Sequence, residues 1–226
     1  MEARKVIGLV AGPTEKDDTP QILVKAVLAG AREEGVKTDL RDLRTPAINY
    51  PEGCHTGSIP AEILPPSDFA EILDRITNAD GIVIGSSASG IAIPAGLERT
   101  LDEITDALHG RMLTGKFGCS ICTSEGDGSL RVVDYMNGCL ERLGITMVGG
   151  VGAVIGKGQS VPAKDLAEAR ELGRILARSI VKDLADPGDE PDEKDRETFY
   201  QRVKSEQDRL TGEFDSFIQN GWTNGP

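Results

Sequence analysis

The sequence lacks long apolar runs, an excess of basic residues and a high cysteine content. No stretch approaches the length of a membrane span, and the N-terminus lacks the apolar core of a signal peptide, so we expect a cytoplasmic protein. The net charge is −12, which disfavours a nucleic-acid backbone or an anionic membrane as a partner. Much of this charge follows Leu184. The four cysteines are expected to be reduced thiols in the cytoplasm.

The remaining composition is that of an ordinary globular protein. Charged residues make up 27% and apolar residues 38% of the 226 positions. This length suffices for one sizeable domain with an appendage.

One stretch, Gly81–Pro94, organises the prediction. It begins as a short apolar run between glycines, which is typical of a strand buried on both faces of a parallel sheet. It continues as a loop of small, hydroxyl-bearing residues, and a helical pattern starts after Pro94. In open α/β sheets, ligands bind outside the carboxyl ends of such strands.

Similar strand-then-helix units recur along the chain. Strands are predicted at residues 5–12, 36–43, 81–85, 116–122 and 145–155. Helical patterns follow at residues 21–31, 68–76, 95–108, 129–143 and 162–184, with Asp68 and Glu71 in capping-box spacing. Leu97, Leu101 and Ile104 are predicted to be buried in the third helix. Leu130, Val133, Leu140 and Leu143 lie on one side of the fourth. Five such units with few hairpin signals predict a parallel sheet with helices on both faces.

Two further segments fall outside this pattern. Residues 45–66 form a long loop rich in proline and glycine, and loops of that length are often functional. An acidic linker at residues 186–196 precedes a helical extension at 197–226, whose apolar face is aromatic-rich. That face could pack on the sheet domain or on another subunit.

The cysteines do not form a metal-binding pattern. Cys119 and Cys122 lie three residues apart on a predicted strand, so they are expected on opposite faces as core thiols. Cys139 lies in a predicted helix and is expected in the core as well. Cys54 and His55 share the long loop, either as a reactive pair or, the interpretation we prefer, as an ordinary loop thiol beside a solvated histidine.

Three predicted strands end in loops that a sheet of order 2-1-3-4-5 would gather at one edge: Gly12–Thr19, Ser86–Gly90 and Thr123–Gly128. The first could hold a phosphate at a helix N-terminus through backbone N–H groups and the helix dipole. Glycine and small residues in the other two could line a flat ring.

These three loops contain motifs that resemble those of a known protein family. The first motif is Val10–Leu23, the second is Gly85–Ser89 followed by Leu97 and Asp102, and the third is Thr123 with Gly126–Gly128. Over Lys5–Leu184 the chain resembles the NAD(P)H-dependent FMN reductase and multimeric flavodoxin family, which includes the iron–sulfur flavoproteins. The latter place a cysteine cluster in the loop where this chain has only Cys54, so no [4Fe–4S] cluster is expected.

The resemblance implies a flavodoxin-like, three-layer, doubly wound five-stranded parallel sheet over residues 1–185. It implies non-covalently bound FMN, NAD(P)H as co-substrate, a small-molecule electron acceptor such as a flavin or quinone, and a homodimer or homotetramer. No side-chain acid, base or metal is required, since the flavin carries the hydride chemistry. The implied cofactor-binding residues are Gly12, Thr14, Lys16, Thr19, Ser86, Ser87, Ala88, Ser89, Gly90, Thr123, Ser124, Glu125, Gly126 and Gly128.

The first loop departs from the family pattern. Pro13 and Glu15 replace the usual serine and arginine, and Asp17 and Asp18 stand where glycines are usual. Ser89 replaces an aromatic residue. Carboxylates near a phosphate are unfavourable, so two alternatives stay open. One is a flavodoxin-like domain that has lost its flavin and serves as an assembly subunit. The other is an electron carrier that does not react directly with NAD(P)H.

Overall fold

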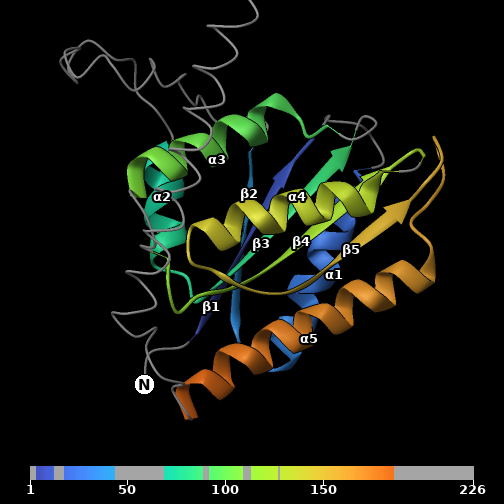
Figure 1. Ribbon diagram of the computed structural model, residues 1–226. Coiled ribbons are helices and arrows are strands. Elements are labelled where there is room, and N and C mark those ends of the chain that lie inside the picture. Colours follow the sequence, from blue (N-terminus) through green and yellow to red (C-terminus); the bar gives the residue numbers. More distant parts are fainter. Residues whose placement is uncertain are drawn as a thin grey trace, which may run out of the picture. The chain divides into compact units, whose positions relative to one another are not determined.

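The computed structural model describes residues 4–12, 18–43, 69–88, 92–108, 113–126 and 128–185. The chain divides into two compact units, Met1–Lys182 and Asp183–Pro226, and the sheet belongs to the first. In chain order the elements are β1 (Lys5–Ala11), α1 (Thr19–Glu33), β2 (Lys37–Asp42), α2 (Phe69–Thr77), β3 (Gly81–Ala88), α3 (Ala95–Leu108), β4 (Phe117–Ser124), α4 (Ser129–Arg142), β5 (Thr146–Val154) and α5 (Ala163–Ala185) (Figure 1).

The five strands form one parallel sheet in the order β2-β1-β3-β4-β5. This is the order predicted from the sequence, and it confirms the flavodoxin-like fold. β3 lies at the centre, and its first six residues are buried on both faces, as the apolar run between glycines indicates.

Helices cover both faces of the sheet (Figure 1). One apolar core joins β1 and β3 side chains to α2, α3 and α4, and the predicted residues Leu97, Leu101 and Ile104 are buried there. The other core joins the opposite face of the strands to α1 and α5. Each strand therefore contributes to two cores, which is why its sequence reads as a continuous apolar run.

Helices α1 and α5 approach each other closely through two glycines. A Cβ on Gly30 would lie 1.9 Å from the carbonyl oxygen of Arg170, and one on Gly173 would lie 1.9 Å from that of Val27. The absence of both side chains lets the helix backbones touch.

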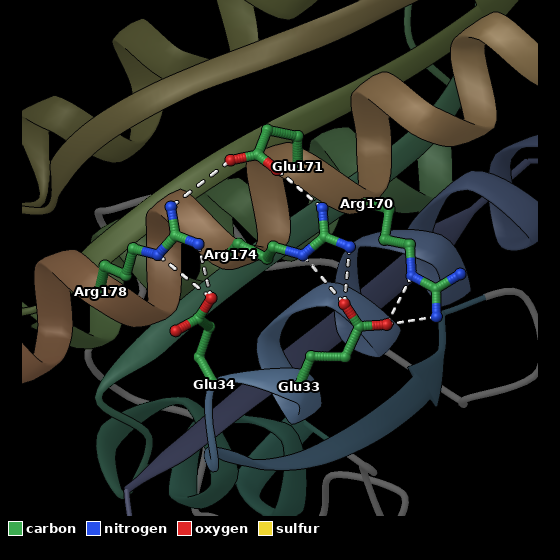
Figure 2. Close-up of polar contacts among 6 residues, drawn as sticks. All are labelled: Glu33, Glu34, Arg170, Glu171, Arg174 and Arg178. Atoms are coloured by element: carbon green, nitrogen blue, oxygen red, sulfur yellow. Dashed lines mark hydrogen bonds and ion pairs between the residues drawn. The ribbon is translucent and has the colours of Figure 1, made fainter.

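Exposed ion pairs flank this crossing (Figure 2). Arg174 Nε donates to Glu33 over 2.9 Å, and Arg178 Nη2 donates to Glu34 over 2.7 Å. Arg170 also pairs with Glu33, and Glu171 accepts from Arg174. The network connects the C-terminal end of α1 to the middle of α5.

Two predicted details were wrong. Ser86–Ala88 and Thr123–Ser124 were predicted as loop, but they continue β3 and β4, because Ser87 pairs with Thr123 and Ala88 with Ser124. Leu130 was predicted to share one side of its helix with Val133, Leu140 and Leu143, but these three are buried and Leu130 is 62% exposed. Val132 and Met136 fill the apolar face of α4 that Leu130 was expected to share.

Several predicted features lie outside the described residues. These are the long loop at 45–66 with Cys54 and His55, the Asp68 cap, the linker at 186–196 and the extension at 197–226. Within the part that the structure does describe, no helix combines the length and apolar character needed to cross a bilayer.

Candidate functional site

The candidate site lies where β1, β3 and β4 end side by side. Ala11 pairs with Ser86, Ser87 with Thr123, and Ala88 with Ser124. We call the carboxyl ends of these three strands, with the described residues that follow them, the crest. The sheet thus brings together the three segments that the sequence analysis predicted to share a site.

Gly12 joins the first and second segments. Its φ is +139°, a conformation that favours glycine, and a Cβ there would lie 2.8 Å from Ser87 Oγ. The chain after β1 therefore runs closely over the end of β3. A side chain at position 12 would collide with Ser87 unless one of the two moved.

Thr19 joins the first and third segments. Its hydroxyl donates a hydrogen bond of 3.0 Å to the hydroxyl of Thr123. The start of α1 reaches β4 because α1 packs closely on β3. A Cβ on Gly85 would lie 2.2 Å from Val24 Cγ2, so only glycine permits this approach.

The start of α1 is capped by an acidic residue that the sequence analysis did not recognise as a cap. Asp18 accepts from the backbone N–H of Gln21 through Oδ1 over 3.2 Å, and its carbonyl accepts from Ile22 N over 3.0 Å. Aspartate before Thr19-Pro20 is a helix-start signal, since aspartate is a preferred N-cap and proline is favoured in the first turn.

The third segment turns sharply away from β4. Ser124 Oγ donates to the carbonyl of Gly126, and the Ser124 carbonyl accepts from Ile155 N over 2.8 Å. Gly128 has a φ of +120° and is the N-cap of α4, without a side-chain capping bond. Glu125 and Gly126 are exposed at this turn.

The predicted site residues differ in how open they are. Ser86 is 0% exposed, and its hydroxyl donates to the carbonyl of Ser87, so its side chain is part of the core. Thr123 is 3% exposed and Ser124 is 6% exposed. Ser87 and Ala88 are partly exposed. A ligand at the crest would therefore meet Ser87 and Ala88 rather than Ser86.

Four predicted site residues, Thr14, Lys16, Ser89 and Gly90, lie outside the described residues. Pro13, Glu15 and Asp17 lie there as well. Their assignment stays a prediction.

The side chains of the three described cysteines are not part of the crest. Cys119 and Cys122 belong to opposite cores, as predicted, and burial raises the pKa of each thiol to about 12. Cys139 is partly exposed on α4, and burial raises its pKa as well. Among the described residues, no three histidine, cysteine or acidic side chains are grouped so that they could hold a metal ion.

Gly12, Ser87 and Ala88 leave the crest without bulky side chains, which is compatible with a flat ring such as that of a flavin. The start of α1, by contrast, has an acidic residue as its N-cap. At the α1 N-terminus, the Asp18 carboxylate already accepts a first-turn N–H.

Comparisons with known proteins also relate this chain to flavin-dependent proteins. The family model described as NADPH-dependent FMN reductase matches residues 4–160. An iron–sulfur flavoprotein of Methanocaldococcus jannaschii is 29% identical over 117 residues, which are 52% of this chain and 60% of the relative. The alignment thus spans less than two thirds of that curated relative.

Solved structures share the fold. RosB, with a bound 8-demethyl-8-formylriboflavin-5′-phosphate intermediate, has a TM-score of 0.70 at 17% identity, covering 90% of this chain and 88% of RosB. An archaeal flavodoxin gives 0.55 at 17% identity, with coverages of 78% and 99%. An NADH:FMN oxidoreductase gives 0.57 at 16% identity, with coverages of 78% and 90%. At these identities the likeness concerns the fold.

Proposed function

Because the chain belongs to the NADPH-dependent FMN reductase family, we propose that it is an oxidoreductase that binds FMN non-covalently and passes electrons from NAD(P)H to a small acceptor such as a flavin or quinone. The observation that supports this proposal most strongly is the junction of three chain segments at the crest. Gly12 lies against Ser87, and Thr19 is hydrogen-bonded to Thr123. In flavodoxin-like sheets, this edge between the first and third strands is where FMN binds.

The residues of the chain would bind and orient the flavin. Ser87 and Ala88 offer small side chains at the end of β3, and Gly12 admits close approach. The turn at Glu125 and Gly126 leads into the N-terminus of α4, whose dipole favours negative charge nearby. The flavin, when bound, supplies the hydride chemistry, so the protein needs no catalytic acid or base of its own.

The visible spectrum of the purified protein tests the proposal. We expect a yellow protein, or a colourless one that takes up added FMN with a protein-dependent change in flavin fluorescence. Rapid anaerobic mixing with NADPH and, separately, NADH should then bleach the flavin absorbance. Reoxidation by free flavin or a quinone identifies the acceptor class.

The two alternatives predict different results. A protein that stays colourless and does not bind added FMN would be a flavodoxin-like assembly subunit. A yellow protein that stays oxidised with both nicotinamides, but accepts electrons from dithionite, would be an electron carrier.

We also propose a homodimer or homotetramer, which the family resemblance implies. Light scattering coupled to size-exclusion chromatography measures the mass of the particle. A mass near the 24.1 kDa of one chain would contradict this proposal.

A further inference from the structure

One edge of the sheet carries backbone groups and apolar side chains that lack a partner among the described residues. We propose that residues 150–154 of β5 pair antiparallel with the same residues of a second copy of the chain, about a twofold axis at Gly152. This inference rests on the homodimer proposed above and goes further by naming the surface that joins the two copies. It does not depend on the flavin.

The hydrogen bonds of β5 show which of its backbone groups face outward. β5 is an edge strand of the described sheet, and its pairing with β4 is regular from Gly150 onward (Figure 1). Ile155 N donates to the carbonyl of Ser124 over 2.8 Å, so residue 155 faces β4. Successive residues of a strand direct their N–H and C=O groups to opposite sides. The backbone groups of Gly150, Gly152 and Val154 therefore point away from β4.

The two edges of the sheet differ in charge. An exposed strand edge can pair with another chain, and natural proteins protect such edges with charged side chains. β2, the other edge, has four charged residues among its six, and Asp39 and Arg41 make ion pairs there. β5 has no charged residue among its nine. β5 is therefore the edge without this protection.

Two exposed apolar side chains flank the outward-facing groups of β5. Leu130, at the start of α4, is 62% exposed, and Val154 is 55% exposed. Leu130 lies over the strand, because a Cβ on Gly152 would lie 2.9 Å from Leu130 Cδ2. Ala153 belongs to the core on the α1 and α5 side, so the side chain of the next residue, Val154, lies on the α4 side. Both apolar side chains are thus on the same face, beside the unpaired backbone.

This surface is complementary to itself. A twofold axis at Gly152 places Gly150 of one copy opposite Val154 of the other, and Gly152 opposite its own counterpart. Outward-facing backbone groups then meet outward-facing groups, as antiparallel pairing and an isologous interface require. Because Leu130 lies over Gly152, the same axis brings the two copies of Leu130 toward each other and removes apolar surface from water.

The charges near this edge also suit a second copy. With a net charge of −12, two copies repel each other unless their acidic residues stay apart. α4 begins with Leu130 over Gly152 and runs toward the start of β5, since a Cβ on Gly150 would lie 2.3 Å from Val133 Cγ1. The exposed Asp134 lies further along α4 in that direction. In an antiparallel pair the two α4 helices leave the axis in opposite directions, which separates their carboxylates.

Opposite charges at position 130 test the pairing. Leu130→Glu and Leu130→Lys each place like charges across the axis, and position 130 is exposed within one chain, so the fold should persist. Val181→Glu is the matched control, because Val181 is a 48% exposed apolar residue on α5. Circular dichroism and thermal unfolding check that each variant is folded. Light scattering coupled to size-exclusion chromatography measures the mass of each at matched protein concentration.

We expect the wild-type protein and Val181→Glu to have the mass of two chains of 24.1 kDa. Leu130→Glu and Leu130→Lys should each weaken the dimer about tenfold or more and shift the mass toward one chain. An equimolar mixture of these two variants should regain the two-chain mass, because a carboxylate then faces an ammonium group across the axis. Added salt should return each single variant toward two chains, since it screens the repulsion.

Three results would overturn the inference: a wild-type protein with the mass of one chain, charged variants that keep the wild-type mass, or a mixture that stays at one chain. FMN titration of the same samples separates the proposed flavin chemistry from the pairing. A one-chain protein that binds FMN would contradict the pairing and the homodimer but not the flavin proposal. A dimer that is lost in both variants and regained on mixing, but does not bind FMN, would contradict only the flavin proposal.

Discussion

The hydroxyl of Thr19 donates to the hydroxyl of Thr123 over 3.0 Å, although 104 residues separate them in the chain. This bond joins the start of α1 to the end of β4. It connects the chain segment expected near the phosphate of a flavin with the segment expected near its ring.

Replacing Thr19 with valine removes this bond and keeps the shape of the side chain. The hydroxyl of Thr123, a residue that is 3% exposed, then loses this partner, so we expect the free energy of unfolding to fall by about 1 kcal/mol in urea titrations. Flavin affinity should fall too, since the crest loses a connection. The double variant with Thr123→Val should cost less than the sum of the single changes. Additive effects would show that the two hydroxyls do not interact in solution.

Gly12→Ala tests the close approach at the crest. Gly12 and Gly35 both have positive φ, but a Cβ at position 12 meets Ser87 Oγ, whereas one at position 35 meets nothing within 4 Å. Both alanine variants should lose about 1 kcal/mol of stability from backbone strain. Only Gly12→Ala should also weaken flavin binding, measured by fluorescence titration. Equal flavin affinities in the two variants would contradict the placement of the ligand at the crest.

Gly30→Ala tests the crossing of α1 and α5. Its Cβ would lie 1.9 Å from the Arg170 carbonyl oxygen, so the helices must separate, and we expect a loss of about 2 kcal/mol or more. Gly138→Ala in α4 is the matched control. Its Cβ meets nothing within 4 Å, and it should stabilise the protein by about 0.5–1 kcal/mol through helix propensity. Thermal unfolding of the two variants should therefore shift in opposite directions.

Alkylation by iodoacetamide should distinguish the described thiols. Burial raises the pKa of Cys119 and Cys122 to about 12, so the reactive thiolate is scarce at pH values near 8, and both side chains are 0% exposed. Cys139 is partly exposed and should react first among these three, in a Cys54→Ser background. Peptide mass spectrometry after timed quenching reports the order. Labelling of Cys119 before Cys139 in the native protein would contradict it.

The Glu33 ion pairs should give a dependence of stability on pH. Hydrogen bonds from Arg170 and then Arg174 hold the pKa of Glu33 below its ordinary value of 4.5. The stabilisation is therefore present above pH 4.5 and is lost as the pH falls through the lower, folded-state pKa. Glu33→Gln should lower the melting temperature slightly at pH 7, and the difference from wild type should shrink in acid and in high salt. Glu168→Gln, which removes an exposed carboxylate from α5, serves as the control.

The sequence by itself determined the order of the elements and which strand lies at the centre. Buried strands such as Gly81–Gly85 read as short apolar runs, and helices such as Ala95–Leu108 show apolar residues at helical spacing, because both patterns depend on neighbours within a few residues. The opposite placement of Cys119 and Cys122 followed from the same local geometry.

Only the tertiary structure decided where the strands end and what meets at the crest. Ser86–Ala88 and Thr123–Ser124 have the composition of a loop, yet they are strand because Ser86 pairs with Cys122, Ser87 with Thr123 and Ala88 with Ser124. Leu130 has the spacing of a core residue, yet it is exposed because Val132 and Met136 fill the core beside it. The bond from Thr19 to Thr123 and the approach of Gly12 to Ser87 join residues distant in the chain, and no local pattern encodes such contacts.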